Sequence, residues 1–154
     1  MASKVFCRNK KAFHDFHIEE TLEAGIELTG SEVKSIRLGR INLKDSFARI
    51  IGGEAFLFNV HISPYAEADT FAQHEPERKR KLLLHKREIL RLLGKTKVKG
   101  FTIVPTKFYL RNGKIKVEIA LARGKTSYDK RETIKKKEAD REVSRAMRHR
   151  LKGN

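Results

Sequence analysis

The chain has 154 residues, of which 39% are hydrophobic and 35% are charged, and its formal net charge is +16 at pH 7. This length suits one domain with an appended arm, and the excess of positive charge favours a polyanionic partner, most commonly nucleic acid. The sequence has no run near the ~20 apolar residues of a membrane span, no signal-peptide pattern and only one cysteine, Cys7, which excludes an intramolecular disulfide and an all-cysteine zinc site. We therefore expect a cytoplasmic protein with no membrane contact.

The charge is unevenly distributed along the chain. Residues 1–11 hold 4 basic side chains and no acidic one, and residues 12–77 hold 12 acidic and 5 basic ones. The balance then reverses, with 14 basic against 2 acidic side chains in residues 78–122 and 12 against 5 in residues 123–154. An acidic first half and a basic second half predict a molecule with one binding side.

The first elements are short. Residues 1–11 are basic and expected to be mobile, and alternation of apolar and polar side chains then predicts strands over residues 16–22 and 25–29. A short helical turn follows at residues 32–37, for which Ser31 is predicted to act as the N-cap.

The middle of the chain predicts a hairpin and a loop. Residues 47–51 and 55–60 flank Gly52-Gly53, a two-residue pattern typical of a tight β-hairpin. Residues 66–77, which contain acids, histidines and Pro76, predict a loop.

A helix and a second hairpin complete the folded part. Leucine and isoleucine spacing predicts a helix over residues 82–93, with Gly94 in the left-handed conformation at its end. Residues 101–110 lead into Asn112-Gly113, and apolar and polar side chains alternate again over residues 115–121. Asn-Gly supplies the positive φ angles that a type I′ turn requires, so this hairpin is the strongest local prediction.

The pattern of elements predicts a mainly β fold. Closely spaced strands with one interrupting helix and no βαβ alternation favour a small antiparallel barrel of the OB type, with short added helices; a sandwich fits the pattern almost as well. We expect residues 1–123 to form this domain and residues 124–154 to form a basic tail. Because the tail has few apolar positions and many like charges, we expect it to be disordered when free and helical when bound to an acidic partner.

No arrangement of residues predicts catalysis, a metal or a cofactor. His14 and His17 have an H-x-x-H spacing, but no further ligand falls in register, and on a strand they point to opposite faces. Gly124-Lys125-Thr126 resembles the end of a phosphate-binding loop, but Ile119 stands where that motif requires its first glycine.

Contacts to RNA are expected from basic groups near flexible segments and aromatic side chains, because phosphates supply affinity and exposed bases supply recognition. Lys114 and Lys116 lie on the face of their strand opposite the apolar set. Tyr128 either stacks on a base or is an ordinary exposed aromatic residue. The other basic candidates are Arg8, Lys10, Lys11, Arg78, Lys79, Arg80, Lys81, Lys86 and Arg87.

Seven segments occur in a familiar order along nearly the whole chain. They are NKKA at 9–12, FHIEE at 16–20, EAGI at 23–26, GSEVKSIR at 30–37, GEAFLF at 53–58, RKLLL at 80–84 and GKTSYDKR at 124–131. Together they resemble the SsrA-binding protein family (small protein B, SmpB), and seven matches in order are far more specific than any single motif here.

This resemblance implies a function and a set of RNA contacts. It implies an OB-fold barrel that binds the transfer-RNA-like domain of transfer-messenger RNA (SsrA), at the elbow where the D-loop and T-loop regions meet. Asn9, Glu23, Leu83 and Lys116 are carried over as contacts from the matching motifs. With the basic candidates, the expected RNA-binding set is Asn9, Lys10, Lys11, Glu23, Arg80, Lys81, Leu83, Lys114 and Lys116.

The resemblance also assigns a role to the tail. It implies delivery of the RNA to stalled ribosomes in trans-translation, where the tail occupies the decoding centre and the empty mRNA channel as a helix. The expected contacts there are Gly124, Lys125, Tyr128, Asp129, Lys130, Arg131, Ile134 and Met147. Tyr128 stands where many relatives carry histidine, a change that preserves stacking but removes the imidazole. The partners implied are transfer-messenger RNA, the ribosome and, indirectly through the RNA, elongation factor Tu; we expect a monomer.

Two other classes of function remain as alternatives. An architectural ribosomal protein with a barrel and a basic extension would reside permanently in the ribosome and would show no preference for an elbow-shaped RNA. A nuclease or RNA-modifying enzyme would need clustered acids or a nucleophile with a base, and the residue spacing indicates neither.

Overall fold

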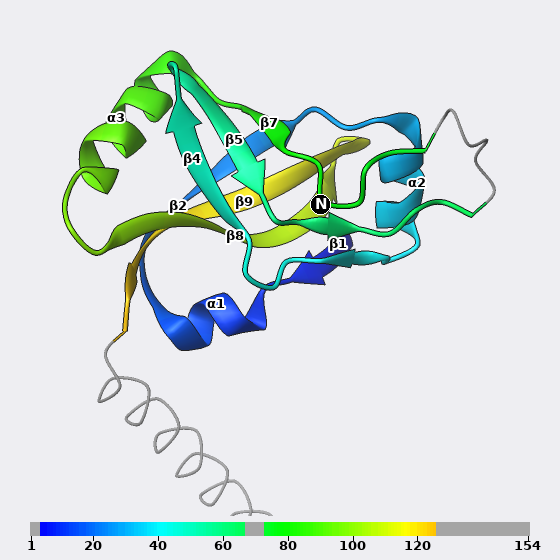
Figure 1. The fold of residues 1–154 in the computed structure, drawn as a ribbon, viewed down its shortest axis with the longest axis horizontal. Coiled ribbons are helices and arrows are strands. Elements are labelled where there is room, and N and C mark those ends of the chain that lie inside the picture. The colour runs from blue at the N-terminus through cyan, green and yellow to red at the C-terminus, as the bar shows by residue number, and fades with distance from the viewer. Residues whose placement is uncertain (1–3, 67–72, 126–154) are drawn as a thin grey trace, which may run out of the picture. The chain divides into compact units, whose positions relative to one another are not determined.

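The computed structural model describes residues 4–66 and 73–125, and within them the chain is mainly β, as predicted. Figure 1 shows the arrangement of the elements. They are, in chain order, β1 (Lys4–Arg8), α1 (Lys10–Asp15), β2 (Phe16–Ile26), α2 (Gly30–Arg37), β3 (Ile41–Asn42), β4 (Phe47–Ile51), β5 (Glu54–Phe58), β6 (His61–Ile62), β7 (Arg80–Leu83), α3 (Lys86–Thr96), β8 (Phe101–Arg111) and β9 (Lys114–Gly124).

Antiparallel pairings connect the strands of the described part into a closed circuit. The main sheet has the order β1-β8-β4-β5-β7-β2-β9, and β9 pairs again with β8. Strand β1 is added to the outside of this circuit on β8, and β3 pairs with β6 separately. Segments far apart in the sequence, such as β2 and β9, therefore lie side by side.

Both predicted hairpins are present, with the turns that their residues require. Gly52 and Gly53 have φ angles of +59° and +78°, and Asn112 and Gly113 have φ angles of +51° and +75°. Two consecutive residues with positive φ are the hallmark of the type I′ turn, whose twist matches that of the flanking strands. A two-residue turn also fixes the register, so that Tyr109 lies opposite Lys116.

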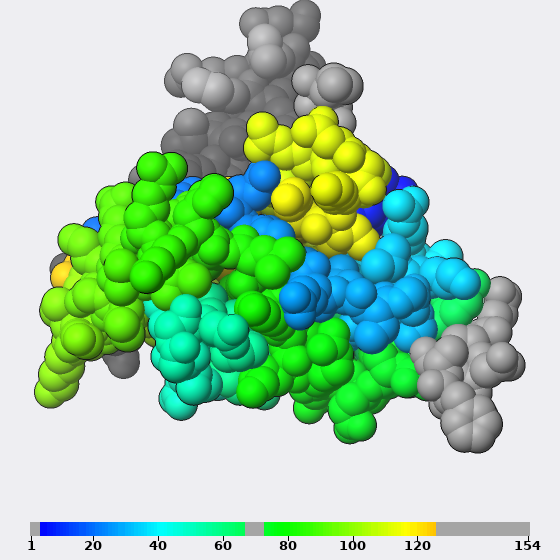
Figure 2. Space-filling view, turned by 90° about the horizontal axis from the view of Figure 1, so that it is seen from above, coloured from blue at the N-terminus to red at the C-terminus, as the bar shows by residue number. Residues whose placement is uncertain are grey.

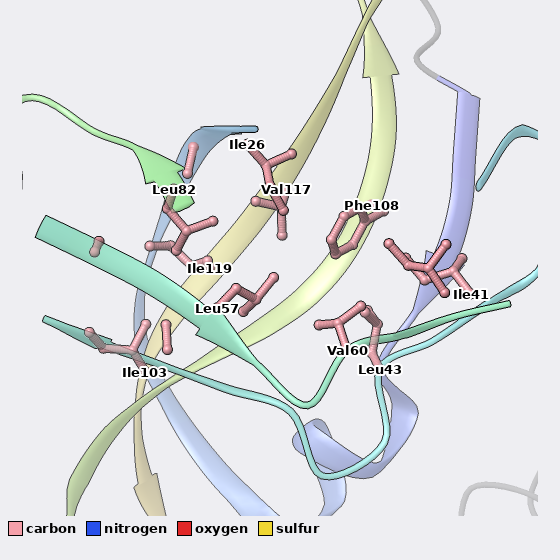
Figure 3. Packing of buried hydrophobic residues seen from close by; sticks show 14 of the residues in the cluster. Ile26, Ile41, Leu43, Leu57, Val60, Leu82, Ile103, Phe108, Val117 and Ile119 are labelled. Atoms are coloured by element: carbon pink, nitrogen blue, oxygen red, sulfur yellow. The ribbon is translucent and has the colours of Figure 1, made fainter. Parts of the chain in front are cut away.

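One hydrophobic core lies inside the circuit of strands (Figure 3). Its fully buried members include Leu57 of β5, Leu82 of β7, Phe108 of β8 and Ile119 of β9. A second, smaller cluster lies where Ala12 of α1 packs on the alanine and valine side chains of β8 and β9. The small side chains there allow α1 to approach the sheet closely.

The predicted helix over residues 82–93 is wrong in its first turn. Residues 80–83 form β7, in which Leu82 pairs with Ile26 and Ala55, and the helix runs over Lys86–Thr96 with Gly94 inside it. Leu82 gains full burial in the core as a strand residue, and this burial outweighs the helical propensity of the leucine run.

The N-terminal segment and the cap of α2 also differ from the predictions. Residues 4–8 pair with β8 and residues 10–15 form α1, although residues 1–11 were expected to be mobile. Thr29, not Ser31, caps α2: its hydroxyl accepts from the Glu32 amide, and the Glu32 carboxylate accepts from the Thr29 amide at 2.8 Å. Ser31 instead hydrogen-bonds His74 at 2.8 Å.

The chain divides after Gly124 into two units, and Lys125 is the one described residue of the second. The predicted conformations of the tail therefore lie outside the described residues. In the part that the structure describes, no helix has the length and apolar character needed to cross a membrane.

Candidate nucleic-acid interface

A groove of about 590 Å³ lies on one face of the circuit, between β2, β7, β9 and the start of α3. Figure 2 shows this face, where the blue segment containing β2, the green segment containing β7 and α3, and the yellow end of the β8–β9 hairpin meet. Four residues of the predicted RNA-binding set line the groove: Glu23, Lys81, Leu83 and Lys116. They come from three strands, and the closure of the circuit brings them together.

Strand alternation explains why these polar side chains face outward. Ala24 and Val117 are opposite each other and are buried in the core. Their neighbours Glu23 and Lys116 must then point to the other side of the sheet, because successive side chains in a strand alternate between faces. The same rule places Tyr109, which lies opposite Lys116, on the outer side with them.

Glu23 is held by two donors from β8. The Tyr109 hydroxyl donates to Glu23 Oε2 at 2.5 Å, and Arg111 Nη1 donates to the same oxygen at 2.7 Å. These bonds, led by the one from Tyr109, lower the pKa of the Glu23 carboxyl, with a further contribution from the positive charge of Lys116. Burial, followed by the bond to Glu23, raises the pKa of the Tyr109 hydroxyl. Glu23 is therefore an ionised, fixed acceptor at neutral pH.

The arrangement explains how the Glu23 carboxylate is accommodated beside lysine side chains. Arg111 balances the charge of Glu23, and both of the hydrogen bonds described end on Oε2. Within the described part of the chain, Oε1 is left as an acceptor for an external donor. A base amino group or a ribose 2′-hydroxyl is such a donor.

Leu83 is exposed beside this carboxylate. Its exposed fraction is 50%, although it belongs to a strand whose preceding residue, Leu82, is fully buried. Gly25 lies opposite Leu83 in the β2–β7 pair, and a Cβ at Gly25 would lie 3.1 Å from the Leu83 Cβ. The absence of a side chain at Gly25 therefore makes room for Leu83 in the lining of the groove.

The lysines of the predicted set differ in how they are held. Lys81 forms an ion pair of 3.2 Å with Glu54, and both side chains are substantially exposed. Lys114 is exposed at the tip of the β8–β9 hairpin, and Lys116 is half-buried at the groove. Exposed ion pairs contribute little to stability, so these cations remain available for phosphate groups.

Asn9 is buried and makes its hydrogen bonds within the protein. It caps α1 by accepting from the Ala12 amide at 3.1 Å, and its Nδ2 donates to the carbonyls of Leu43 at 3.3 Å and Pro105 at 2.9 Å. The residue is only 6% exposed. Asn9 therefore acts by fixing α1 on β8.

The two lysines that follow Asn9 are exposed on α1. Lys11 forms an ion pair of 2.7 Å with Asp45, and this hydrogen bond raises the pKa of the Lys11 ammonium and lowers that of the Asp45 carboxyl. Neither Lys10 nor Lys11 lines the groove that contains Glu23.

Arg80 requires a correction, because its side chain is fully buried and presents no donor at the surface. Its Nε donates to Glu32 Oε2 at 2.5 Å, and its Nη1 donates to the Val60 carbonyl at 2.7 Å. Arg78 Nη2 donates to the other carboxylate oxygen of Glu32 at 2.7 Å. Arg80 thus belongs to an internal ion-pair network that ties β7 to α2.

The residues expected in the decoding centre are only partly described. Gly124 ends β9, where it pairs with Phe16, and Lys125 is half-buried. The others lie outside the described residues: Tyr128, Asp129, Lys130, Arg131, Ile134 and Met147.

Three residues of the site were not predicted from the sequence: Gly25, Tyr109 and Arg111. The signal for the latter two is the alternation of Lys107, Tyr109 and Arg111 along β8. Because the Asn112-Gly113 turn fixes the register of the hairpin, this alternation places Tyr109 and Arg111 on the same face as Lys116.

The described residues include no cluster of three or more histidine, cysteine, aspartate or glutamate side chains that could hold a metal ion. What the groove offers instead is a fixed carboxylate, two lysines and an exposed leucine. These groups suit phosphates, donors on sugars or bases, and the apolar faces of nucleotides.

Known proteins are similar to this chain along nearly its full length. The family model for SmpB protein matches residues 6–149. An SsrA-binding protein of Shouchella clausii (strain KSM-K16) is 60% identical over 150 residues, which cover 97% of this chain and 96% of that one. An SsrA-binding protein of Persephonella marina (strain DSM 14350 / EX-H1) is 59% identical over 152 residues, which cover 99% of each chain.

A solved structure is also similar. It is described as "tmRNA-SmpB: a journey to the center of the bacterial ribosome", and its chain is 52% identical to this one, with a TM-score of 0.66. The similarity covers 79% of this chain and 85% of that chain.

Proposed function

The chain belongs to the SmpB family, and from this premise we propose that it binds the transfer-RNA-like domain of transfer-messenger RNA and delivers it to stalled ribosomes. Its relatives are SsrA-binding proteins, and the similar solved structure is that of a tmRNA-SmpB complex with the bacterial ribosome. The protein acts as an RNA-binding factor in trans-translation, and such a role places it in the cytoplasm.

The observation that carries this proposal is the groove in which Glu23, Lys81, Leu83 and Lys116 meet. Two lysines supply attraction to phosphates, which by itself is independent of sequence and shape. Glu23, fixed by Tyr109 and Arg111, adds an acceptor that repels phosphate and accepts from a sugar or base. This combination selects a folded RNA in which phosphates and an accessible base or ribose occur together, as at an RNA elbow.

The architecture supports an OB-type barrel as the scaffold of this interface. The pairings β8-β4-β5-β7-β2-β9 return to β8, so the sheet has one added strand, β1, outside a closed circuit. Closure pairs each strand of the circuit on both sides and holds the groove residues at fixed spacing. A rigid scaffold of this kind keeps the ordering cost of RNA binding low.

The remainder of the chain has a separate role in this proposal. Residues 124–154 form the tail, which folds as a helix along the empty mRNA channel and contacts the decoding centre. Residues 124–154 hold 11 basic and 5 acidic side chains, an excess of positive charge that suits a channel lined with RNA phosphates. The protein acts as a monomer, and elongation factor Tu joins through the RNA.

The test compares two RNAs at several salt concentrations. The full chain is titrated with the acceptor-elbow fragment of transfer-messenger RNA and with an RNA duplex of equal length. A preference for the elbow that persists as salt rises supports recognition of RNA shape. Equal affinities that decrease together with salt would mean that charge alone governs binding, and an architectural ribosomal protein would then be the better account.

A matched pair of variants locates the interface. Lys116→Ala and Leu83→Ala are expected to weaken the complex with the acceptor-elbow fragment (the elbow complex), because both side chains line the groove. Lys44→Ala serves as the control for charge, since Lys44 is exposed and does not line the groove. If Lys44→Ala weakens the elbow complex as much as Lys116→Ala does, the groove is not the binding site.

A further inference from the structure

The outer face of the β4–β5 hairpin carries a group of aromatic and basic side chains that the proposed function does not use. We call it the aromatic face and define it as Phe47, Arg49, Phe56, Phe58 and Lys79. The residues between them, such as Ala48 and Leu57, are buried in the core, so alternation directs the aromatic set outward. In Figure 1, β4 and β5 lie at the front of the molecule, with no described helix covering them.

The register explains how this face is built. Phe47 lies opposite Phe58 and Arg49 lies opposite Phe56 in the β4–β5 pair. The Phe47 and Phe58 rings are stacked, with centroids 5.3 Å apart and planes at 16°. Side chains of opposite residues in an antiparallel pair are close enough to interact directly, and the hairpin therefore presents the rings as one ordered group.

Cations lie over two of these half-buried rings. The Arg49 guanidinium lies 5.2 Å from the centroid of Phe47, and Lys79 Nζ lies 4.5 Å from the centroid of Phe56. Arg49 and Lys79 are both exposed. Arg49 thus places a planar, charged group next to the stacked Phe47–Phe58 pair, and a nucleobase can stack on such a group.

Phe47 and Arg49 also line a hollow of about 340 Å³. Ala12, Phe16 and Val104 line it with apolar side chains. Lys11, which is paired with Asp45 at 2.7 Å, and Asp15 belong to the same lining. The apolar walls suit a flat base, whereas the two carboxylates disfavour a phosphate inside the hollow.

We propose that the aromatic face binds an unpaired RNA strand, with bases stacked on the rings and on Arg49 and with phosphates near Lys79 and Lys81. The rings favour a strand over a duplex, because the bases of a duplex are already stacked on each other. The cations favour RNA over an apolar protein segment, because such a segment would remove their water without neutralising their charge. Lys81 connects this face to the groove, which it also lines.

The experiment measures the affinity of the full chain for a labelled short oligoadenylate and for a blunt RNA duplex of equal length, over a range of salt concentrations. Phe56→Leu keeps an apolar side chain at that position but removes the aromatic ring. It is expected to weaken oligoadenylate binding about five-fold or more, without changing the dependence of affinity on salt. Arg49→Gln is expected to weaken oligoadenylate binding. It should also reduce the slope of log affinity against log salt concentration by about one.

Phe13→Leu is the matched control, because Phe13 is an exposed phenylalanine on α1 outside the aromatic face. It is expected to leave oligoadenylate binding unchanged. Binding of the elbow fragment is measured with the same variants, so that failure of this proposal is distinguished from failure of the proposed function. An elbow complex that depends on Lys116, together with an oligoadenylate affinity that is insensitive to Phe56→Leu and Arg49→Gln, overturns the aromatic face alone.

A second measurement uses the unaltered chain and does not depend on the stability of a variant. On addition of oligoadenylate, the ring resonances of Phe47, Phe56 and Phe58 are expected to shift upfield in NMR spectra, and those of Phe13 are expected to stay in place. Unchanged resonances of all three face rings at saturating oligoadenylate would overturn the proposal, and would leave the face as a surface for a protein partner.

Discussion

Gly25 of β2 and Leu83 of β7 are opposite each other in an antiparallel pair, and a Cβ at Gly25 would lie 3.1 Å from the Leu83 Cβ. That contact is tighter than ordinary van der Waals contact, so a side chain at position 25 would require Leu83 to move by a few tenths of an ångström. Leu83 lines the groove in a half-exposed position. It can do so because the residue opposite it is glycine, which has a hydrogen atom in place of a side chain.

Gly25→Ala is therefore expected to displace Leu83. The loss of binding free energy for the elbow fragment should exceed the loss of free energy of unfolding. Overpacking of this kind costs about 1–3 kcal/mol in a core, and less is expected here because Leu83 is half exposed. The measurements are urea unfolding and affinity for the elbow fragment. Gly30→Ala is the control, since a Cβ there meets no atom within 4 Å; equal losses of affinity in both variants would contradict the role given to Gly25.

Tyr109→Phe is expected to raise the pKa of Glu23 toward its usual range, because the Tyr109 hydroxyl is the leading cause of its lowered value. The bond from Arg111 remains, so the pKa should stay somewhat below normal. The carboxyl resonance of Glu23, followed by NMR as the pH is lowered, measures this shift. Loss of one hydrogen bond should also weaken the elbow complex about three-fold or more; an unchanged titration of Glu23 would show that Tyr109 does not hold it.

Glu32→Gln is expected to destabilise the fold without altering the affinity of the folded protein for the elbow fragment. Glu32 and Arg80 are both fully buried and paired, and removing one partner of such a pair costs about 3–5 kcal/mol. Calorimetric or urea unfolding measures the loss. Lys81→Gln, which breaks an exposed pair with Glu54, should cost far less; equal losses would contradict the importance of burial.

The same pair predicts how stability depends on pH. Burial raises the pKa of the Glu32 carboxyl, but hydrogen bonds from Arg78, the Thr29 amide and Arg80 together lower it. A carboxyl whose pKa is lower in the folded state contributes stability above its unfolded pKa and loses that contribution as the pH falls through the folded value. The acid unfolding of Glu32→Gln should therefore be less steep than that of the wild type below pH 4.5, the ordinary value for this group.

Asn9 is expected to affect RNA binding through the position of α1. Asn9→Ala removes the N-cap and leaves the carbonyls of Leu43 and Pro105 without their donor, which should cost about 1–3 kcal/mol. Asn9→Asp keeps the cap acceptor but not the donor, so its loss of stability tests the donor bonds. Affinity for the elbow fragment is measured under conditions in which each variant is fully folded. A loss of affinity in a variant whose NMR spectrum shows α1 unmoved would mean that Asn9 contacts RNA directly.

Deletion of the residues after Gly124 is expected to leave affinity for the elbow fragment nearly intact at high salt and to abolish peptide tagging on stalled ribosomes. The groove residues all belong to the unit that ends at Gly124, whereas the proposed decoding-centre contacts belong to the tail. Binding to the elbow and tagging in a translation extract are measured separately. Loss of elbow binding would contradict the division between barrel and tail.

The sequence by itself determined the mainly β class, both hairpins and the excess of positive charge. These properties are local or compositional: two adjacent glycines, or Asn112 with Gly113, fix a turn and its register without help from distant residues. The net charge likewise follows from composition and does not depend on the fold. The motifs that resemble the SsrA-binding family supplied Glu23, Leu83 and Lys116, and the structure brings these together with Lys81 in one groove.

Only the tertiary structure decided which basic residues face the solvent and which elements form around them. Arg80 and Lys81 are neighbours in one basic run, but Arg80 is buried with Glu32 and Lys81 is exposed, because β7 alternates its side chains between the core and the surface. The leucine run after them favours a helix by propensity, and burial of Leu82 between Ile26 and Ala55 makes it a strand. Contacts between residues far apart in the chain cannot be read from local pattern, since their free energy exists only once the circuit of strands has closed.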